Sequence, residues 1–441
     1  MRIGINALFF RFLTTGSGQY LTHLLKALAE VDQENEYVLL GPDPLPPEQP
    51  GRGQGQPVSY REGDQAGWEQ GRPGRGADRP GRGQGQPLPY TKGDGDRFRY
   101  LRTPVPNFAR RRATTEKLVW EQFTAPAGAR KAGVDLYHVP YFAPPYFPRT
   151  PSVITIHDVI PLRLPVYRTS PRMKAYLQLV ARAAHKATLI ITVSQHARQD
   201  MIDALKLPAE RIRVIYEAAG EEYQPVTDPE RLARVRARYG VGERYIFYLG
   251  GLDYRKNVPL LVRAFAHLYQ QMHEPHLQLL IAGNPDKKSG PLFPDPRPVA
   301  ADLGMSGQII YRYIEEEDKP AVYSGASAFV FPSSYEGFGL DPLEAMRCGA
   351  PVICSNRTSL PEVVGDAAIT FDPDNIGQLV AEMRSVLSNS DLATDLRARS
   401  LRQAAKFSWK RTAEETLAVY EEVYKRSRKR GYASTAARSS T

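Results

Sequence analysis

The sequence predicts an α/β protein built from two doubly wound parallel sheets with helices on both faces of each. Short apolar segments rich in β-branched or aromatic residues, such as 153–156 and 245–249, alternate along the chain with amphipathic helical segments. Several of these strands end directly in glycine or polar residues. Because such alternation favours right-handed crossovers between parallel strands, and 441 residues suffice for two cores, we expect two domains.

The composition is that of a globular protein, with 42% hydrophobic and 24% charged residues. No run of 18 apolar residues occurs, and the first strand begins at once, without the three regions of a signal peptide. Cys348 and Cys354 are too few for a disulfide framework or a metal cluster. We therefore expect a cytoplasmic protein.

The formal net charge of +10 is concentrated in part in two basic segments, 110–131 and 425–431. An anionic membrane surface, a phosphate-bearing substrate or a nucleic acid would each attract such segments. Solvated charge without a partner explains a single cluster equally well.

The first domain is expected to span residues 1–217. Its first strand runs over 2–10 and is followed by a turn holding Gly16 and Gly18 and by a helix over 19–30. This layout can aim backbone N–H groups at a phosphate, although an ordinary tight turn explains the two glycines as well. The pattern further predicts strands at 37–40, 134–138, 153–156, 188–193 and 214–216, and helices near 117–123, at 174–186 and at 195–205.

Residues 42–96 interrupt this pattern with a segment rich in glycine, proline and arginine. The run 51–57 recurs almost unchanged as 81–87, and aliphatic side chains are nearly absent. Such a segment cannot bury enough apolar area to offset its ordering entropy. We predict a disordered insertion in a surface loop; an Arg-Gly tether for nucleic acid is the functional alternative, but no nucleic acid partner is expected.

His157 and Asp158 directly follow the strand 153–156. In an open parallel sheet, groups just past the carboxyl end of a strand line the ligand crevice. The alternative is a buried histidine with a structural partner. A hinge is expected between residues 217 and 227.

The second domain is expected to span residues 218–408. Here the strand 245–249 ends in Gly250 and Gly251, and Arg255 and Lys256 precede a helix over 259–271. Glycines after a strand, followed by cations at a helix start, favour a diphosphate site over a tight turn with solvated charges. Further strands are predicted at 277–282, 309–311, 328–331, 352–353 and 368–370, and a helix at 229–239.

The stretch 328–346 organises this domain as a buried strand, a glycine-bearing loop and a short helix. In one interpretation Asp341 is the N-cap and Glu344 completes a capping box. In the other, Gly337 and Gly339 let backbone N–H groups approach an anion, and Glu336 and Glu344 bind hydroxyls of the same ligand. After it, we expect a helix over 409–426 that carries an apolar stripe and a disordered basic tail over 427–441.

Three motifs carry a resemblance: Glu336 and Glu344 with seven residues between them, the run from Gly250 to residue 257, and His157-Asp158. With them the chain resembles the retaining glycosyltransferases of family four, which have the GT-B fold, over nearly all residues except the insertion and the tail. The resemblance implies two Rossmann-like domains facing a cleft. The first would bind the acceptor, the second a nucleotide-sugar donor, and the last helix would cross back to the first domain.

The same resemblance implies roles for individual residues. Arg255 and Lys256 would pair with the donor diphosphate, Glu344 would bind the ribose and Glu336 the sugar hydroxyls. Glu336, His157 and Asp158 would be the catalytic residues, and His157 would contact the donor sugar from the opposite domain. The remaining donor contacts would come from backbone or loop positions: Gly337, Phe338, Gly339, Leu340, Gly250, Gly251, Gly16, Gly18, and, at the base, Tyr313 and Ile314.

The leading hypothesis is therefore metal-independent transfer of a hexose to a glycan or lipid-linked acceptor. Mannose from GDP-mannose is preferred because of the run 157–162, while UDP-glucose and UDP-N-acetylglucosamine stay open as donors. The alternatives are a non-catalytic scaffold or nucleic-acid binder on the same fold, and a nucleotide-sugar epimerase. The resemblance is interrupted at residues 217–220 and 284–302, where the sequence departs from the family pattern. Peripheral contact with an anionic membrane is a further expectation.

Overall fold

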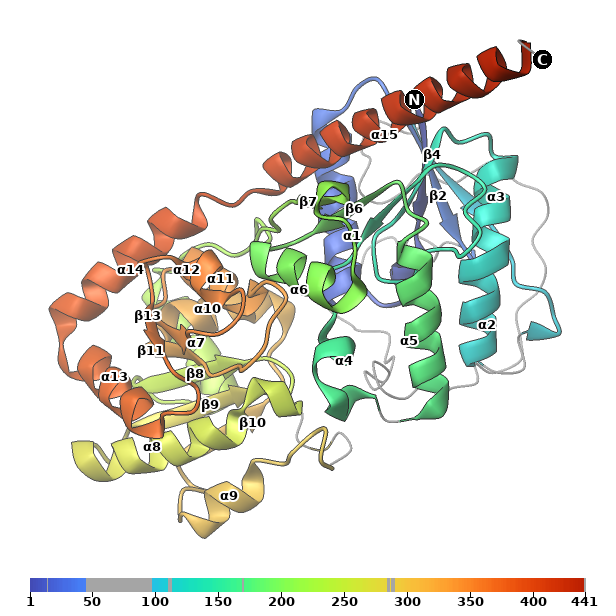
Figure 1. Ribbon diagram of the computed structural model, residues 1–441. Coiled ribbons are helices and arrows are strands. Elements are labelled where there is room, and N and C mark those ends of the chain that lie inside the picture. The colour runs from blue at the N-terminus through green and yellow to red at the C-terminus, as the bar shows by residue number, and fades with distance from the viewer. Residues whose placement is uncertain are drawn as a thin grey trace.

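The computed structural model describes residues 1–13, 15–44, 97–109, 113–168, 170–283, 286 and 290–439, with the backbone alone from residue 429 onward. Figure 1 shows two α/β domains side by side and one long helix, α15, that runs from the second domain across the first. Apart from residues 42–44, the expected insertion lies outside the described residues.

The first domain is built on a seven-stranded sheet in which all neighbouring strands pair in parallel. The spatial order is β3-β2-β1-β4-β5-β6-β7, so the winding direction reverses between β1 and β4, as in a doubly wound sheet. Its strands are β1 (Arg2–Asn6), β2 (Glu36–Gly41), β3 (Phe98–Arg102), β4 (Leu136–Val139), β5 (Ser152–Thr155), β6 (Leu189–Thr192) and β7 (Ile212–Val214).

The second domain repeats this plan with six parallel strands in the order β10-β9-β8-β11-β12-β13. Its winding direction reverses between β8 and β11, and the predicted α/β class with two doubly wound sheets is confirmed. The strands are β8 (Tyr245–Leu249), β9 (Gln278–Ala282), β10 (Ile309–Arg312), β11 (Ala328–Phe331), β12 (Val352–Ser355) and β13 (Ile369–Phe371).

Helices surround both sheets, whose strands are buried and rich in Ile, Val, Leu and Phe. A π-helical turn, Trp120–Thr124, joins α2 to α3. The helices are α1 (Gly16–Val31), α2 (Ala113–Val119), α3 (Ala125–Lys131), α4 (Ile160–Arg163), α5 (Pro171–Ala184), α6 (Gln195–Leu205), α7 (Pro229–Tyr239), α8 (Val258–Met272), α9 (Arg297–Asp302), α10 (Lys319–Gly325), α11 (Leu340–Arg347), α12 (Leu360–Val364), α13 (Ile376–Ser388), α14 (Ser390–Ala404) and α15 (Trp409–Ser439).

The first strand ends earlier, and the first helix begins earlier, than the sequence predicts. The Asn6 side chain accepts a hydrogen bond from the Leu8 N–H at 3.0 Å, and this local turn ends β1. Thr15 caps α1 by accepting the Gly18 N–H, so Gly16 and Gly18 lie in the first helical turn. A Cβ atom on Gly18 would lie 2.1 Å from the Phe12 carbonyl oxygen, which explains the glycine there.

Helix α15 begins at Trp409 as expected, but it continues to Ser439 instead of ending in a disordered tail after residue 426. The segment 427–439 contains no proline, and alanine and arginine, both strong helix formers, make up much of it. The ion pairs Glu421–Lys425 and Glu422–Arg426 support the helix just before this segment. None of the described helices combines the length and the apolar character needed to cross a bilayer.

A buried hydrogen-bond chain fixes α15 to the first sheet. His138 on β4 is fully buried, its Nδ1 lies 2.7 Å from the Tyr420 hydroxyl and its Nε2 lies 2.9 Å from Thr155 Oγ1. Burial lowers the pKa of His138 to about 3, so the ring is neutral and one nitrogen donates while the other accepts. The helix that leaves the second domain is thus held directly by the strands of the first.

We expect Tyr420→Phe to destabilise the protein by about 1–3 kcal/mol, because it leaves a buried His138 nitrogen without a partner. Chemical denaturation would measure the loss. Tyr424→Phe, on a less buried turn of the same helix, is the control and should change stability by no more than about 0.5 kcal/mol. Equal stability of the two variants would contradict this account of the contact.

Candidate functional site

The candidate site lies where the winding of the second sheet reverses. β8 and β11 are neighbours in parallel register, and the loops that follow them therefore leave the same edge of the sheet. The Ser334 N–H donates to the Arg255 carbonyl at 2.7 Å and joins the two loops. This edge is where open α/β sheets bind ligands.

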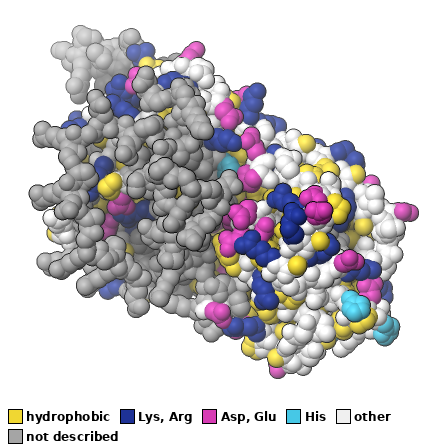
Figure 2. Space-filling view, turned by 180° about the vertical axis from the view of Figure 1, so that it is seen from behind, with side chains coloured by type: hydrophobic (Ala, Val, Ile, Leu, Met, Phe, Trp, Pro, Cys, Tyr) yellow, Lys and Arg dark blue, Asp and Glu magenta, His cyan; other side chains and the backbone are white. Residues whose placement is uncertain are grey.

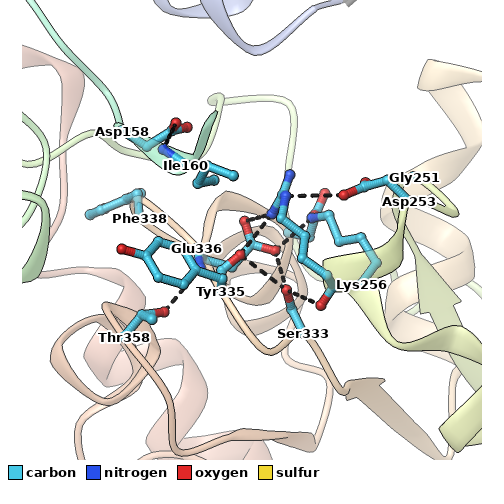
Figure 3. A network of polar contacts seen from close by, with 12 residues as sticks. Asp158, Ile160, Gly251, Asp253, Lys256, Ser333, Tyr335, Glu336, Phe338 and Thr358 are labelled. Carbon is cyan, nitrogen blue, oxygen red and sulfur yellow. Dashed lines mark hydrogen bonds and ion pairs between the residues drawn. The ribbon is translucent and has the colours of Figure 1, made fainter. Parts of the chain in front are cut away.

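The predicted cations and one predicted carboxylate form a buried ion cluster (Figure 3). Glu336 Oε2 lies 2.5 Å from Arg255 Nη1, and Glu336 Oε1 lies 2.9 Å from Lys256 Nζ. The Ser333 hydroxyl donates to Glu336 Oε1 at 2.6 Å, and Lys256 also reaches Asp341 at 3.3 Å. The structure thus brings together residues 80 positions apart in the sequence. Buried charges of this kind are stable only when each is paired with an opposite charge.

These contacts keep Glu336 ionised. Burial by itself would raise the pKa of this carboxyl, but the charges of Arg255 and Lys256 outweigh burial and hold the pKa at about 2. Glu336 is therefore an anion at any physiological pH. It can accept hydrogen bonds and stabilise positive charge, but it cannot act as a proton donor.

Both cations are also oriented by further contacts. Arg255 pairs with Asp253 at 3.1 Å and donates to the Tyr335 carbonyl at 2.9 Å. The Lys256 ammonium lies 4.5 Å from the ring centroid of Phe331, at the end of β11. Two fixed, adjacent cations beside a helix N-terminus are suited to bind an anionic ligand that displaces part of these pairings.

Glu344 lies in α11 and has the opposite protonation behaviour. It accepts a hydrogen bond from the Tyr323 hydroxyl at 3.2 Å. Burial, helped by Asp341 and Glu316, raises its pKa from 4.5 to about 8 in spite of Lys319. The carboxyl is therefore mostly protonated at neutral pH and can both donate to and accept from the hydroxyls of a ligand.

The capping box predicted at Asp341 and Glu344 is not formed. α11 starts at Leu340 with Gly339 as its N-cap, because Gly339 has a φ of +126° and turns the chain before Asp341 is reached. Asp341 thus sits inside the first turn, and its carboxylate pairs with Lys256 instead of capping the helix. This leaves the N–H groups of the first turn of α11 free of a side-chain cap.

His157 and Asp158 approach this site from the first domain. A Cβ atom on Gly337 would lie 2.6 Å from the His157 carbonyl oxygen and 2.9 Å from Asp158 Cβ, so only glycine allows this close approach. Asp158 accepts the Ile160 N–H at 3.0 Å, and burial raises its pKa although Arg255 opposes the shift. His157 Nε2 lies 3.2 Å from Glu217 Oε1, without hydrogen-bond geometry.

Direct contacts between the domains surround the site. Ser194 donates to the Gly337 carbonyl at 2.6 Å, and Tyr335 next to Glu336 hydrogen-bonds Asp200 of the first domain. Glu362 accepts the Gln195 N–H at the start of α6, at 2.8 Å. The two domains therefore face each other at the site, as expected, and they are in contact there.

Of the other predicted positions, some lie near this ion cluster and others lie further from it. Gly250 directly follows β8 and has a φ of +150°, Gly251 comes next, and Phe338 is buried beside Tyr216. Gly16 and Gly18 open α1, whose Tyr20 packs edge-on against His157. Tyr313 and Ile314 follow β10, two strands away from β8. They lie outside the ion cluster, but Glu316 just beyond them acts on the pKa of Glu344.

Sequence reasoning missed the hydroxyl side chains that support Glu336 and the carboxylates beside the cations. The Glu336 N–H donates to Thr358 Oγ1 at 2.9 Å, and Ser359 donates to the Glu336 carbonyl at 3.0 Å. Both residues follow β12, a neighbour of β11, so polar residues after a strand were the available signal.

Among the described residues, no group of three or more His, Cys, Asp or Glu is placed to hold a metal ion. Independence from metal remains a prediction.

Comparisons with known proteins agree with this geometry. A family model described as "Glycosyl transferases group 1" matches residues 233–403, and one described as "Glycosyltransferase Family 4" matches residues 14–219. The O-antigen chain mannosyltransferase B of Escherichia coli is 33% identical over 288 residues, which is 65% of this chain and 74% of that protein.

A second relative and a solved structure extend these findings. The serotype-specific mannosyltransferase WbdA of Escherichia coli is 32% identical over 267 residues, 59% of this chain, and this chain spans only 32% of its length. The structure of Anabaena HepE in complex with UDP-glucose superposes with a TM-score of 0.64 at 15% identity, covering 96% of this chain and 100% of that one. At this identity the likeness shows the GT-B fold alone.

The raised pKa of Glu344 predicts that stability falls as the pH rises from about 5 to 8. Between its ordinary pKa of 4.5 and its folded value of about 8, the folded protein binds a proton that the unfolded chain has lost. Glu344→Gln removes this titration, so the wild type should lose stability relative to the variant over that range. Denaturation midpoints at several pH values test this, with the exposed Glu243→Gln as control. Parallel pH profiles of wild type and Glu344→Gln would refute it.

Proposed function

The chain belongs to glycosyltransferase family 4, and we propose that it is a retaining, metal-independent enzyme that transfers a hexose to a hydroxyl of a glycan or lipid-linked acceptor. Mannose from GDP-mannose is the leading donor. The observation that carries the proposal is the ionised Glu336 held between Arg255 and Lys256, with His157 and Asp158 opposite it on the other domain.

The cations would stabilise the leaving group. When the sugar–phosphate bond breaks, negative charge builds on the nucleoside diphosphate, and fixed cations placed there need no reorganisation. Lys256 is buried, Arg255 is half-buried, and both are held by ion pairs, while the N–H groups of Gly339 and Leu340 lie at the start of α11 beside them. In the free protein Glu336 and Asp341 form ion pairs with the two cations. The donor diphosphate would replace part of these ion pairs.

The two glutamates would have different roles. Glu336 stays ionised, so it would accept hydrogen bonds from sugar hydroxyls and stabilise positive charge that develops on the ring. It could not serve as the acid of a two-carboxylate glycosidase, and a diphosphate leaving group needs none. Glu344 would hold the ribose hydroxyls, because its mostly protonated carboxyl both donates and accepts.

The acceptor would approach from the first domain, past His157 and Asp158. In a front-face reaction the anomeric carbon loses its bond to the phosphate oxygen and gains one to the acceptor oxygen on the same face. The acceptor proton passes to the leaving phosphate. His157 and Asp158 are close to Gly337 and hence to the Glu336 loop, which suits contacts to the sugar during this exchange.

Donor and acceptor identity rest on likeness to relatives. Two relatives are named as mannosyltransferases of Escherichia coli, which supports mannose. UDP-glucose or UDP-N-acetylglucosamine is the alternative donor, since a protein of the same fold binds UDP-glucose. A scaffold or a nucleic-acid binder is disfavoured by the intact ion cluster; salt-sensitive RNA or DNA binding that disappears on deleting residues 45–95 would favour it.

We expect GDP-mannose, tested beside UDP-glucose, UDP-N-acetylglucosamine and ADP-glucose without added metal, to raise the melting temperature most.

Glu336→Ala should lower kcat roughly 10²–10³-fold while donor binding changes little, because the Glu336 carboxylate stabilises charge that develops in the transition state. Lys256→Ala should lower kcat and also weaken donor binding, because it removes a charge that would face the diphosphate. Thermal shift and donor turnover measure these effects, with Glu414→Ala, an exposed position on α15, as control. Normal turnover by Glu336→Ala would refute the site.

We also propose peripheral contact with anionic membrane through the basic segments 110–131 and 425–431. In the described part of these segments, Lys425 and Arg426 pair with glutamates one turn earlier in α15. On the face shown in Figure 2, cationic and anionic side chains of the second domain are intermixed. The attraction should therefore be moderate and salt-sensitive.

Vesicles containing about one third anionic lipid should sediment the protein at low salt and release it when the ionic strength is raised toward about 0.5 M. Neutral vesicles are the control. A variant with Lys425, Arg426 and Arg428 changed to Gln should sediment less. Failure of the wild type to sediment with anionic vesicles at low salt would remove this proposal.

A further inference from the structure

The loop between β12 and α12 contains a residue in an unfavourable backbone conformation. Thr358 has a φ of +57°, in the left-handed region that β-branched residues rarely adopt. Among the described residues, the other non-glycine residues with positive φ are Lys206, Asn257 and His273, and each stands at the end of a helical segment, where this conformation is common. Thr358 ends no helix, so its conformation needs another cause.

The side chain of Thr358 is directed at Glu336. Thr358 Oγ1 accepts the Glu336 N–H at 2.9 Å, as Figure 3 shows. The next residue, Ser359, is fully buried and shares its one hydroxyl proton between the Phe338 carbonyl at 2.6 Å and the Glu336 carbonyl at 3.0 Å. Both backbone polar groups of Glu336 are therefore bound by two consecutive hydroxyl side chains from the neighbouring strand's loop.

The same loop supports Glu336 indirectly as well. Ser355, at the end of β12, donates to the Ser333 carbonyl at 2.5 Å, and the Ser333 hydroxyl in turn donates to the Glu336 carboxylate. Ser359 stands at the N-cap position of α12, yet its side chain makes no capping hydrogen bond there. Its hydroxyl bonds the Glu336 loop in place of its own helix, which indicates that the loop is arranged around Glu336.

We propose that Thr358 is a positioning residue for Glu336, and that its strained backbone is retained because it aims the hydroxyl at the Glu336 N–H. The inference rests on the proposed role of Glu336 in transfer. The strain is local, at a site where the surrounding structure fixes the conformation, as is usual where backbone strain serves function. Without this hydrogen bond, the Glu336 carboxylate would shift relative to the two cations, and a misplacement of about 1 Å costs roughly 100-fold in rate.

Four variants of the full-length protein separate positioning from stability. Thr358→Ala removes the hydroxyl but keeps a side chain in the left-handed region, whereas Thr358→Gly removes the hydroxyl and the strain together. Thr358→Ser keeps the hydroxyl. His273→Gly is the matched control, because it relieves a φ of +52° at the exposed end of α8, away from the site. Slow hydrolysis of GDP-mannose to mannose and GDP gives kcat and KM without a known acceptor.

We expect Thr358→Ala and Thr358→Gly to lose kcat to the same extent, roughly 10–100-fold, with KM for GDP-mannose changed less than threefold. Thr358→Gly should melt a few degrees above Thr358→Ala, Thr358→Ser should keep most of kcat, and His273→Gly should gain stability at unchanged kcat. Wild-type kcat in either the Ala or the Gly variant, or a kcat that follows melting temperature across the set, would overturn the proposal.

A crystal structure of Thr358→Gly without donor makes the test independent of the proposed function. The wild-type measurement alone decides whether GDP-mannose is a donor, so an inactive wild type would count against the proposed donor and not against the positioning role. In the variant structure, we expect the Glu336 carboxylate to have moved from Arg255 or Lys256. An unmoved carboxylate would overturn the proposal whatever the donor is.

Discussion

The rest of the site depends on the buried pairing of Glu336 with Arg255 and Lys256. Charges removed from water in this way are tolerated only as pairs, and losing one member of a buried pair commonly costs about 3–5 kcal/mol. Ser333, Asp253 and Asp341 complete the hydrogen bonding of the cluster. The pairing holds the carboxylate ionised and the cations in place before any ligand arrives. This is the preorganisation that stabilisation of a charged transition state requires.

The sheet topology brings these residues together. β8 and β11 are far apart in sequence but neighbours in space, because the winding direction of the second sheet reverses between them. Their loops leave the same edge, where the N-terminus of α11 also begins. The loop after β12, one strand further, supplies the hydroxyls that bind the Glu336 backbone. Three consecutive strand ends therefore build one site.

The two domains are coupled through this site and through α15. Gly337 touches His157 and Asp158 so closely that a larger residue would push the domains apart. Within the first domain, Tyr420 of α15 is bound to His138, which is in turn bound to Thr155, the last residue of β5 and two positions before His157. A movement of either domain would thus alter the surroundings of His157.

Local periodicity and polar residues that follow strands were enough to predict the α/β class, most strand positions, and the two cations and Glu336 of the ion cluster. Gly250, Arg255, Lys256 and Glu336 could be singled out in this way. How their charges are paired could not be predicted and is seen only in the folded protein. Asp341 caps no helix because Gly339 turns the chain first, and Glu344 is mostly protonated because its neighbours bury it. No local sequence pattern marked Thr358 and Ser359, because their partner Glu336 is more than twenty residues away in the sequence. Burial and pairing are set by distant segments, so periodicity and spacing along the chain do not reveal them.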